Sequence, residues 1–527
     1  MKRIFIFAAT MMSLGVAAQE TYESAQLATE DLNGTSRYIG MGGAMEALGA
    51  DISTMHTNPA GVGMMRRSWV GITAGATIQQ GNSNVNGIFN KTGVTNADLD
   101  QVGFVYSTTT RKGNTLNLGF NFKKNRNFNE ILTATNRLYE ASASTKSAIG
   151  KIVGRYNYSD YLVNEVFNAQ ISDGETAGYA VADSYAFSSI NDGYIGEYAF
   201  NISGSIGNRV YLGLGVGVKS VHYQADSEYA ETLLDAFDDY RGDLSISDWR
   251  KITGTGVDVK FGAIFRPIES SPFRIGLYIN TPTWYRLTCR TEQSASFFVD
   301  PNNNVDVQTG KVLVDDTYGN STKWDYNVNT PWKFGVSLGH TIANMFAIGL
   351  TYQYSDYSAI DNRRASIDTY DYVDGWGWGY TESYRTSYSD NVMNRNTERS
   401  LKGVSLLKLG FEAKPVPEVA IRLGYNFQSA IYDKNGTKET TLDTDGSYLA
   451  SNSFTNWGDT HRITFGLGFK LAPSLNLDMA YQYATTKGDY YPFEKMTETS
   501  STVGNIPVST EVKDNRHQLS ATLGYRF

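Results

Sequence analysis

Cysteine and proline are scarce in this chain of 527 residues. Its single cysteine, Cys289, excludes an intrachain disulfide, so the chain is not an array of small disulfide-stapled domains. The 11 prolines form no linker-like tract. One large domain is therefore as compatible with the sequence as the two to four ordinary domains that the length would allow.

Charge is also low. Charged residues make up 19% of the chain, below the roughly 25% of an average globular protein. The formal net charge is −8 and the isoelectric point about 5.3, so the basic footprint of a nucleic-acid-binding protein is missing and we expect no nucleic-acid partner. Aromatic residues reach 13%, which excludes a disordered chain.

Long apolar runs are missing after the first 18 residues, and the mean hydropathy is −0.35. Both observations exclude a helical membrane protein. They do not exclude a membrane barrel, because a barrel strand needs only one apolar face. The relevant signal is then the alternation of apolar and polar residues.

The first 18 residues have the pattern of a secretory signal peptide. Lys2 and Arg3 precede the apolar stretch Ile4 to Ala18, which ends in small residues. This stretch is shorter than the roughly 20 residues of a spanning helix. We expect residues 1–18 to be removed and the mature chain to begin near Gln19.

Strict alternation is clearest at the C-terminus, where Leu519, Ala521, Leu523, Tyr525 and Phe527 share one face and polar residues or glycine share the other. Fourteen such segments are predicted strands: 69–78, 101–109, 116–124, 196–206, 209–222, 251–266, 273–288, 327–341, 346–357, 404–414, 419–428, 460–471, 475–484 and 516–527.

The connections between these segments alternate between short turns and long loops, which is the layout of a transmembrane β-barrel, as is the even strand number. The 51 glycines suit a polar lumen-facing side, and the 35 tyrosines suit the aromatic girdles of a barrel. The alternative is a soluble β-sandwich or propeller, whose solvent face would carry more charge than this sequence provides. The predicted fold is therefore all-β, a 14-stranded antiparallel transmembrane barrel.

Two regions lie outside the strands. Residues 19–67 are rich in small and apolar residues and lack strand alternation. The second and third long loops contain apolar residues at helical spacing, which predicts short amphipathic helices. Their apolar stripes are candidates for ligand capture, although they could equally pack loop against loop: Leu162, Val166, Phe167, Tyr229, Leu233, Leu234 and Phe237.

The chain combines a small-residue N-terminal segment, the sequence TNPAG at residues 57–61, 14 predicted strands and a terminal Phe527. In these features it resembles the FadL-type family of outer-membrane transporters for long-chain fatty acids and other hydrophobic compounds. The resemblance implies that residues 19–67 form a hatch inside the lumen and residues 68–527 form the barrel. It assigns Asn58, Pro59, Ala60 and Gly61 to the hatch motif, although this sequence alone is ordinary turn chemistry.

The resemblance also implies helical surface loops that capture the ligand and a kinked third strand through which the ligand leaves sideways. The corresponding stretch is Leu116 to Lys124. Tyr525 and Phe527 resemble the terminal signal that the outer-membrane barrel assembly machinery reads. Together with lipid and a hydrophobic ligand, that machinery is an expected partner.

Nothing in the sequence predicts an enzyme, a metal site or a cofactor. The five histidines, His56, His222, His340, His461 and His517, are scattered, and neither H-E-x-x-H nor G-x-S-x-G occurs. The leading hypothesis is passive uptake of hydrophobic small molecules across the bacterial outer membrane. Hemin reception, surface binding or adhesion, and an enzymatic barrel are the alternatives.

Overall fold

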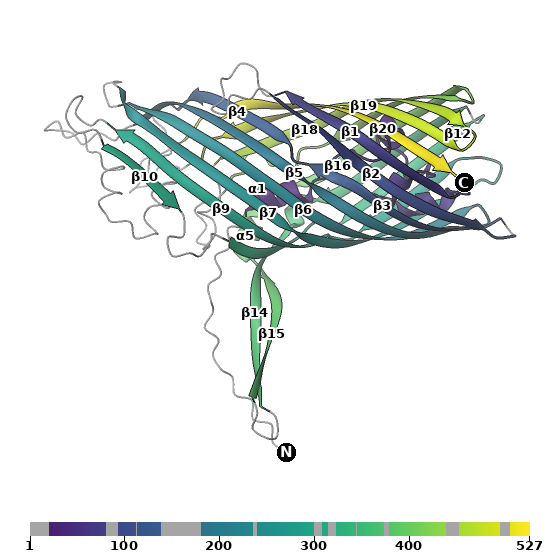
Figure 1. The fold of residues 1–527 in the computed structure, drawn as a ribbon, viewed down its shortest axis with the longest axis horizontal. Helices are drawn as coiled ribbons and strands as arrows, with labels where there is room; N and C mark the ends of the chain where they lie inside the picture. The colour runs from purple at the N-terminus through teal and green to yellow at the C-terminus, as the bar shows by residue number, and fades with distance from the viewer. Residues whose placement is uncertain are drawn as a thin grey trace.

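The computed structural model describes residues 20–80, 93–111, 113–138, 181–234, 240–299, 308–314, 323–343, 345–373, 379–438, 453–495 and 506–527. Strands dominate these residues and wrap around one central axis as a single antiparallel sheet (Figure 1). The last strand pairs with the first, from Trp69 opposite Arg526 to Gln80 opposite Asn515, so the sheet closes into a barrel.

The strands are β1 (Trp69–Gln80), β2 (Gly93–Thr109), β3 (Thr115–Asn127), β4 (Glu130–Arg137), β5 (Val181–Ile206), β6 (Val210–Leu234), β7 (Tyr240–Phe265), β8 (Arg274–Asn280), β9 (Trp284–Val299), β10 (Gln308–Val314), β11 (Lys323–Asn329), β12 (Lys333–Ile342), β13 (Phe346–Asp356), β14 (Asp361–Val373), β15 (Gly379–Ser389), β16 (Gly403–Val416), β17 (Val419–Gln428), β18 (Phe454–Ala472), β19 (Leu475–Tyr491) and β20 (Thr510–Arg526). The helices are α1 (Thr21–Ala28), α2 (Ser36–Gly40) and α5 (Asn391–Ser400), with short 3-10 helices η1 (Ile52–His56), η2 (Pro59–Met64) and η3 (Tyr357–Ala359).

These segments make a wall of 14 strands. β3 and β4 are two parts of the third wall strand, β8 and β9 of the seventh, and β11 and β12 of the eighth. β10 pairs with the outer end of β9, and β14 and β15 form a separate ribbon. Each of the 14 predicted strands falls within one wall strand, so the predicted barrel is confirmed.

Alternation along each strand separates lipid from lumen. In β20 the side chains of Leu519 and Leu523 are 53% and 44% exposed, whereas Ser520 and Thr522 between them are buried. The exposed positions of the other wall strands are likewise mostly aliphatic or aromatic. Such a continuous apolar outer surface suits lipid, and the polar residues face inward.

Two wall strands are interrupted side by side, at Pro282 between β8 and β9 and at Pro331 between β11 and β12. Proline has no N–H to donate to the ladder, so it breaks a strand where it occurs. The neighbouring backbone is still satisfied, because Thr330 N donates to Thr283 O at 3.1 Å and Thr283 N donates to Thr330 Oγ1 at 2.8 Å.

The third long loop corrects a prediction. Residues 227–234 were expected to be helical, but they continue β6, which pairs with β7 from Tyr229 opposite Ile246 to Leu234 opposite Tyr240. The helix prediction was wrong because the hydrogen-bonded pairing of two long strands outweighs a local sequence pattern. β5, β6 and β7 have 26, 25 and 26 residues. Because roughly 9–11 residues of a strand cross a bilayer, the ends of these strands near the long loops extend beyond it.

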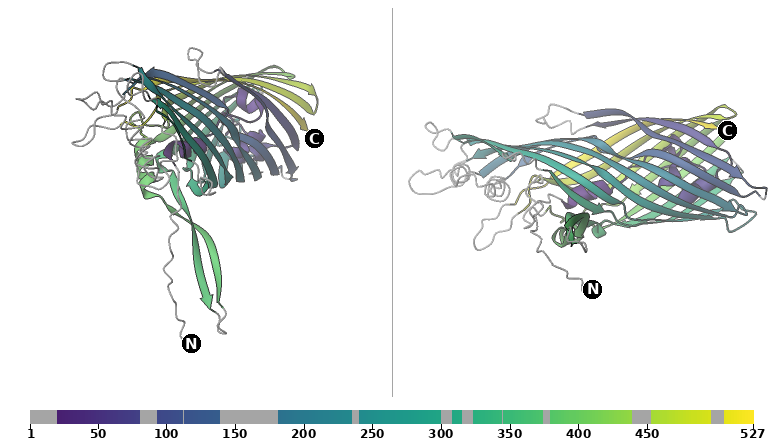
Figure 2. Two further views of the ribbon diagram at one scale, coloured as in Figure 1. Left: turned by 60° about the vertical axis from the view of Figure 1, so that its left-hand side comes forward. Right: turned by 60° about the horizontal axis from the view of Figure 1, so that its bottom comes forward.

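The N-terminal residues 20–64, called the plug below, lie inside the barrel, where Figure 2 shows their short helices in purple behind the wall. They contact two separate parts of the wall: α2 packs against β18 and β19, and η2 packs against β5, β6 and β7. The expected position of an N-terminal hatch in the lumen is confirmed. Among the residues described, no helix is long and apolar enough to cross a membrane.

Candidate functional site: the plugged lumen and the interrupted third strand

The NPAG sequence forms the last turn of the plug before the wall begins. Asn58 caps η2, its side-chain Oδ1 accepting from Ala60 N at 3.2 Å, while its Nδ2 donates to Glu46 O at 3.2 Å. Pro59 occupies the first helical turn, where a missing N–H costs nothing. Gly61 O accepts from Ala50 N at 2.9 Å. The motif thereby ties two turns of the plug together and faces β5, β6 and β7.

Wall glycines let the plug backbone touch the wall directly. A Cβ atom at Gly213 or Gly262 would collide with Asn58 or Pro59, and one at Gly424 would collide with Gly42. A Cβ atom at other wall glycines would likewise meet atoms of residues 40–63 of the plug: Gly119, Gly276, Gly339, Gly349, Gly410 and Gly466. The glycine-rich inner face therefore provides room for the plug rather than for an open channel.

Charge complementarity holds the plug to the wall. Residues 20–64 contain six acidic residues and one basic residue, Arg37. All but one of the acidic residues form an ion pair with a cation from outside the plug: Glu20 with Lys438 at 2.7 Å, Glu23 with Arg250, Glu30 with Lys333 at 2.8 Å and with Lys219 at 2.9 Å, Asp31 with Arg126 at 2.7 Å, and Glu46 with Lys408 at 2.6 Å. The sixth, Asp51, accepts hydrogen bonds from Thr35 and Ser53 within the plug.

Glu46 shows how deeply these ion pairs can be buried, because its side chain is 0% exposed. Its carboxylate also accepts from Tyr38 Oη at 3.0 Å and from Thr351 Oγ1 at 2.8 Å. A buried charge is tolerated only when it is paired and hydrogen-bonded. Glu46 meets this condition with one partner from the plug and two from the wall.

Glu30 and His56 are two of the plug groups whose pKa values are shifted. Burial raises the pKa of Glu30, but Lys333 and Lys219 outweigh burial and hold it well below its ordinary value. Burial lowers the pKa of His56 to about 4, so its imidazole is neutral at pH 7. Its Nδ1 lies 3.0 Å from Glu197 Oε1 and its Nε2 lies 2.8 Å from Asn121 Nδ2, so His56 serves as a wall contact.

Besides the ion pair of Glu23, α1 contributes apolar side chains to a buried layer shared with the wall. Tyr22 stacks on Tyr432 with ring centroids 4.9 Å apart and packs against Phe454 at 5.2 Å. Wall residues complete the layer, and most of them come from β7, β9 and β11: Ile252, Tyr285, Leu287, Cys289, Trp324, Tyr326 and Val328. Cys289 therefore lies in apolar packing, without the surroundings of a reactive thiol.

The third wall strand is interrupted at Phe128 and Asn129, between β3 and β4. Up to Lys123, opposite Gln101, β3 pairs with β2. Beyond this point residues 93–100 of β2 pair with β1 alone among the described strands. The stretch from Leu116 to Lys124, to which the resemblance assigned a kink, is continuous within β3, and the interruption lies beyond it.

After the interruption the chain turns inward. Phe128 N still donates to Gly193 O of β5 at 3.0 Å, and Gly193 has a φ of 106°, which favours glycine. β4 then pairs with β5 but leans onto the lumen side of β1 and β20, where Ile131 N donates to Gln79 Oε1 at 2.7 Å and Asn136 Nδ2 donates to Thr510 Oγ1 at 3.1 Å. A gap in the wall ladder results, and β4 lies behind it.

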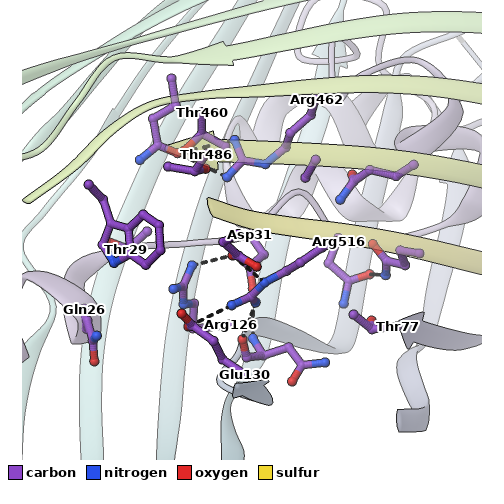
Figure 3. A pocket seen from close by; sticks show the side chains of 18 of the residues that line it. Gln26, Thr29, Asp31, Thr77, Arg126, Glu130, Thr460, Arg462, Thr486 and Arg516 are labelled. Atoms are coloured by element: carbon purple, nitrogen blue, oxygen red, sulfur yellow. Dashed lines mark hydrogen bonds and ion pairs between the residues drawn. The ribbon is translucent and has the colours of Figure 1, made fainter. Parts of the chain in front are cut away.

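A polar cavity of about 120 Å³ lies between α1, this interruption and β18 to β20 (Figure 3). Two ion pairs cross this cavity. Arg126 Nη1 of β3 donates to Asp31 Oδ1 of the plug at 2.7 Å, and Arg516 Nη2 of β20 donates to Glu130 Oε2 of β4 at 3.0 Å. Asp31 Oδ2 also accepts from Asn127 N at 2.9 Å. The plug is thus bonded to the residues that turn the third strand out of the wall.

Ion pairing also closes the edge of the gap. Lys124 Nζ on β3 lies 2.6 Å from Asp98 Oδ2 on the unpaired part of β2. Asn33 of the plug donates to Lys124 O at 3.1 Å and to Asp100 Oδ1 at 3.3 Å. This polar seal has a member from each of the plug, β2 and β3.

A second cavity of about 120 Å³ lies at the mouth, above α1. Aromatic residues such as Tyr22, Phe454 and Tyr490 line it, and so do six charged residues that include Glu23, Arg250 and Lys438. A larger open groove of about 890 Å³ runs along the outside of the barrel beside Leu212, Phe261 and Phe334. These three side chains are about half exposed on the lipid face. We therefore assign the outer groove to lipid and the inner cavities to the functional site.

The structure brings few of the predicted site residues together. Leu162, Val166, Phe167 and Phe237 lie outside the described residues. Tyr229 is buried, stacks on Tyr185 at 5.7 Å and donates to Glu231 Oε2 at 2.6 Å. Leu233 and Leu234 end β6. The charged partners of the plug were missed, although one of them, Lys219, already stood on the polar face of its predicted strand.

The C-terminal residues lie where the barrel closes. Tyr525 and Phe527 are 47% and 57% exposed, on the outer surface near the short turns. Phe527 N donates to Ser68 O at 3.1 Å, just before β1 begins. The Phe527 ring lies 6.4 Å from that of Phe104 and 6.1 Å from that of Tyr525. The last residue therefore contacts the first two strands.

Within the described ranges, no group of three or more His, Cys, Asp or Glu side chains could hold a metal ion.

Comparison with known proteins gives similarity in structure only. No protein-family model matches the chain, and no curated protein matches it. A Pseudomonas aeruginosa FadL homologue of known structure is 10% identical and aligns over 95% of this chain and 99% of its own, with a TM-score of 0.50. The toluene transporters TbuX of Ralstonia pickettii and TodX of P. putida are 13% and 10% identical, each over 94% of this chain and 99% of theirs, with TM-scores of 0.46. The likeness to the FadL homologue confirms the predicted resemblance at the level of the fold.

Proposed function

We propose that this chain, whose fold is that of FadL-type outer-membrane transporters, carries hydrophobic small molecules such as long-chain fatty acids across the bacterial outer membrane without an energy source. The observation that carries this proposal is the combination of a plug that fills the lumen with a gap in the ladder of the third strand. A straight aqueous path is blocked, whereas a sideways path into lipid needs only the movement of a polar seal.

The mouth supports capture of an apolar molecule. Seven aromatic side chains of the plug and the wall line the cavity above α1, together with six charged residues. The aromatic rings provide large apolar contact areas for a ligand. Below it, the cavity beside Arg126 and Arg516 reaches the interrupted third strand. A ligand that enters at the mouth would therefore pass α1 before it reaches the gap.

Passage requires movement of the plug. Each inner cavity has a volume of about 120 Å³, whereas ligand pockets usually measure about 300–1,000 Å³. The structure is thus a closed state for any long-chain ligand. We propose that residues 19–67 act as the gate, that residues 1–18 are removed on export, and that β4 shifts away from β1 and β20 when the gap opens.

Uptake by cells lacking other such channels tests the proposal. Asp98→Cys and Lys124→Cys place two thiols across the seal, and a short bifunctional maleimide joins them. We expect cross-linking to abolish uptake of radiolabelled oleate, because the gap can no longer open. A second pair, Thr108→Cys and Leu116→Cys, joins exposed neighbours in the intact part of the same ladder and should leave uptake unchanged.

Normal uptake through the cross-linked seal would show that the gap is not the exit. Absence of oleate uptake by the unmodified protein would exclude fatty acids as the ligand class, and this result would not concern the route of exit. Mass spectrometry of small molecules that copurify with the protein in detergent then identifies the class directly.

A further inference from the structure

Three cations lie in a row on the outer face of the wall, where β7, β9 and β11 are neighbours. Lys251 of β7 lies opposite Arg290 of β9, and Arg290 lies opposite Lys323 of β11. All three side chains are exposed, whereas Cys289, next to Arg290, is buried inside the barrel. Arg286 of β9 is exposed on the same outer face. We call these four residues the basic patch: Lys251, Arg286, Arg290 and Lys323.

The row of three cations repels itself. Like charges directly opposite each other on paired strands destabilise a sheet, because their Cβ atoms are only about 4.5–5.5 Å apart. Glu292 and Asp325 share this outer face, but Asp325 Oδ1 accepts from Thr288 Oγ1 at 2.6 Å. Within the described part of the chain, no carboxylate forms an ion pair with any cation of the basic patch.

Another pair of opposite lysines shows how the chain relieves the same repulsion elsewhere. Lys487 of β19 lies opposite Lys513 of β20, and the two side chains are 65% and 51% exposed. Glu511 Oε1 lies 3.5 Å from the Nζ atom of each lysine, so a carboxylate of the chain bridges them. The described residues provide no such bridge for the basic patch. An anion from outside the chain would have the same effect there.

The basic patch begins where the lipid-facing surface ends. On β7, Phe265, Phe261 and Val257 face outward and are 45%, 48% and 43% exposed. Beyond Val257 the outward residues are two threonines and then Lys251. Trp284 of β9 lies opposite Val257 and is 46% exposed. Because tryptophan is enriched at the interface between lipid and water, this level marks the outer edge of the hydrocarbon layer.

The height of the basic patch above this edge indicates the kind of lipid that fits. Arg286 and Arg290 follow Trp284 by two and six residues along β9. At a rise of about 3.4 Å per residue and a strand tilt of about 40°, they lie roughly 5 Å and roughly 15 Å above the edge. The headgroups of an ordinary bilayer add only about 5–8 Å on each side. A headgroup of linked, phosphorylated sugars, as in lipopolysaccharide, reaches both levels.

We propose that the basic patch binds the phosphate groups of lipopolysaccharide in the outer leaflet of the bacterial outer membrane. Arginine binds a phosphate through two parallel N–H donors, and lysine adds a compact positive charge. A phosphate held between Arg290 and either lysine offsets the repulsion within the row. The proposal depends on the outer-membrane location, with the long loops facing outward, and not on the transport of a hydrophobic ligand.

Lipid binding by the full-length protein in a neutral detergent tests the proposal, with native mass spectrometry to count the bound lipid. The ligands are rough-type lipopolysaccharide, the same lipid after phosphatase treatment, phosphatidylglycerol and inorganic phosphate. We expect untreated lipopolysaccharide to bind at least about tenfold more tightly than the other three, because only it brings several charge-assisted hydrogen bonds to both levels of the patch.

Two double variants locate the site. Arg290→Gln with Lys323→Gln removes two adjacent charges of the row and should weaken lipopolysaccharide binding at least about tenfold, since hydrogen bonds to charged groups are lost. Lys487→Gln with Lys513→Gln removes two opposite lysines that Glu511 already bridges and should leave binding unchanged. Heat-modifiable gel migration checks that both variants fold.

Stability in detergent provides a second readout. Without lipopolysaccharide, Arg290→Gln should unfold no more readily than the unmodified protein, because the substitution removes repulsion. With lipopolysaccharide, the unmodified protein should gain more stability than the variant, because a ligand stabilises the folded state that binds it.

Equal lipopolysaccharide binding by the two double variants, or equal binding of the lipid before and after phosphatase treatment, would overturn the proposal. Equally tight binding of phosphatidylglycerol would instead make the patch a site for any anionic lipid, and equally tight binding of inorganic phosphate would make it a site for the free ion. An Arg290→Gln variant that is less stable without lipid would show that the chain itself holds this cation.

Discussion

Buried ion pairs are the residue-scale feature that distinguishes this lumen from an apolar core. The Glu46 and Lys408 side chains are 0% and 5% exposed. Taking one charge out of such a pair leaves the other buried without a counterion, and the desolvation of that remaining charge is the main cost. The pairs therefore restrict substitution on both the plug and the wall.

Lys408→Met should lower the free energy of unfolding by about 3–5 kcal/mol, as expected when one partner of a buried ion pair is lost. The double variant Lys408→Met with Glu46→Gln should recover much of this loss, because no charge is then buried. Urea unfolding in detergent micelles measures both. Lys487 and Glu511 form an exposed pair, at 65% and 61%, so Lys487→Met should change stability by less than about 1 kcal/mol. A double variant as unstable as the single one would contradict this explanation.

Deleting Phe527 should reduce barrel assembly in the membrane. The deletion removes the backbone bond to Ser68 and the ring contacts with Phe104 and Tyr525 at the junction of the first and last strands. Heat-modifiable gel migration measures the folded fraction, with Phe527→Tyr as the conservative control. Normal folding of the deletion variant would remove the assembly role of the terminal residue.

The plug is the element whose removal has the largest expected effect. A closed barrel of 14 strands is wide enough to leave a channel when it is empty. Deleting residues 22–60 should raise the single-channel conductance in planar bilayers and abolish selective uptake. Pro59→Gly loosens the last turn of the plug and should impair uptake without opening a large pore. A truncated barrel that conducts no better than the intact one would show that the segment is not a plug.

Acid should weaken the attachment of the plug. The pKa of Glu30 is held well below its ordinary value, and the pKa of Asp31 is also lowered, because Arg126 outweighs the effect of burial. A depressed carboxyl pKa contributes stability above the ordinary value near pH 4, and this stability is lost as the pH falls through the depressed pKa. Conductance should thus stay low between pH 7 and pH 5 and rise only well below pH 4. In Glu30→Gln the rise should be smaller, and a rise already at pH 6 would point to other groups.

Strands could be predicted from the sequence more completely than the elements between them. Alternation is imposed by lipid on one side and a polar lumen on the other, so the segment 516–527 was recognisable without any partner. A kink in the third strand was implied only by the family resemblance, and at residues 116–124 rather than after β3, although five consecutive polar residues from Lys123 to Asn127 end the alternation. That run indicates where the strand leaves the lipid. The helix expected near Leu234 failed because its pattern was local and the β6 ladder is not.

At the scale of the whole molecule, the sequence shows the acidic residues of the plug and the cations of the wall, but it does not show which of them pair. Both sets of charges are visible in the sequence, but the pairing of Glu46 with Lys408 spans more than three hundred residues. Chain order alone cannot specify such pairs, because they follow from how the wall closes. The plug was predicted from its composition and its position before the first strand. Its partners needed the structure.

The wall glycines also divide the plug into two parts with different freedom. Residues 40–63 approach the wall glycines closely, in several places backbone to backbone, although the side chains of Glu46 and His56 also reach the wall. Residues 20–37 instead reach the wall through the long flexible arms of lysine, arginine and glutamate. The lower part therefore behaves as a fixed floor on which the upper part can tilt. A molecule could then travel around the tethered helix and out through the gap while the floor keeps water and ions from leaking across the membrane.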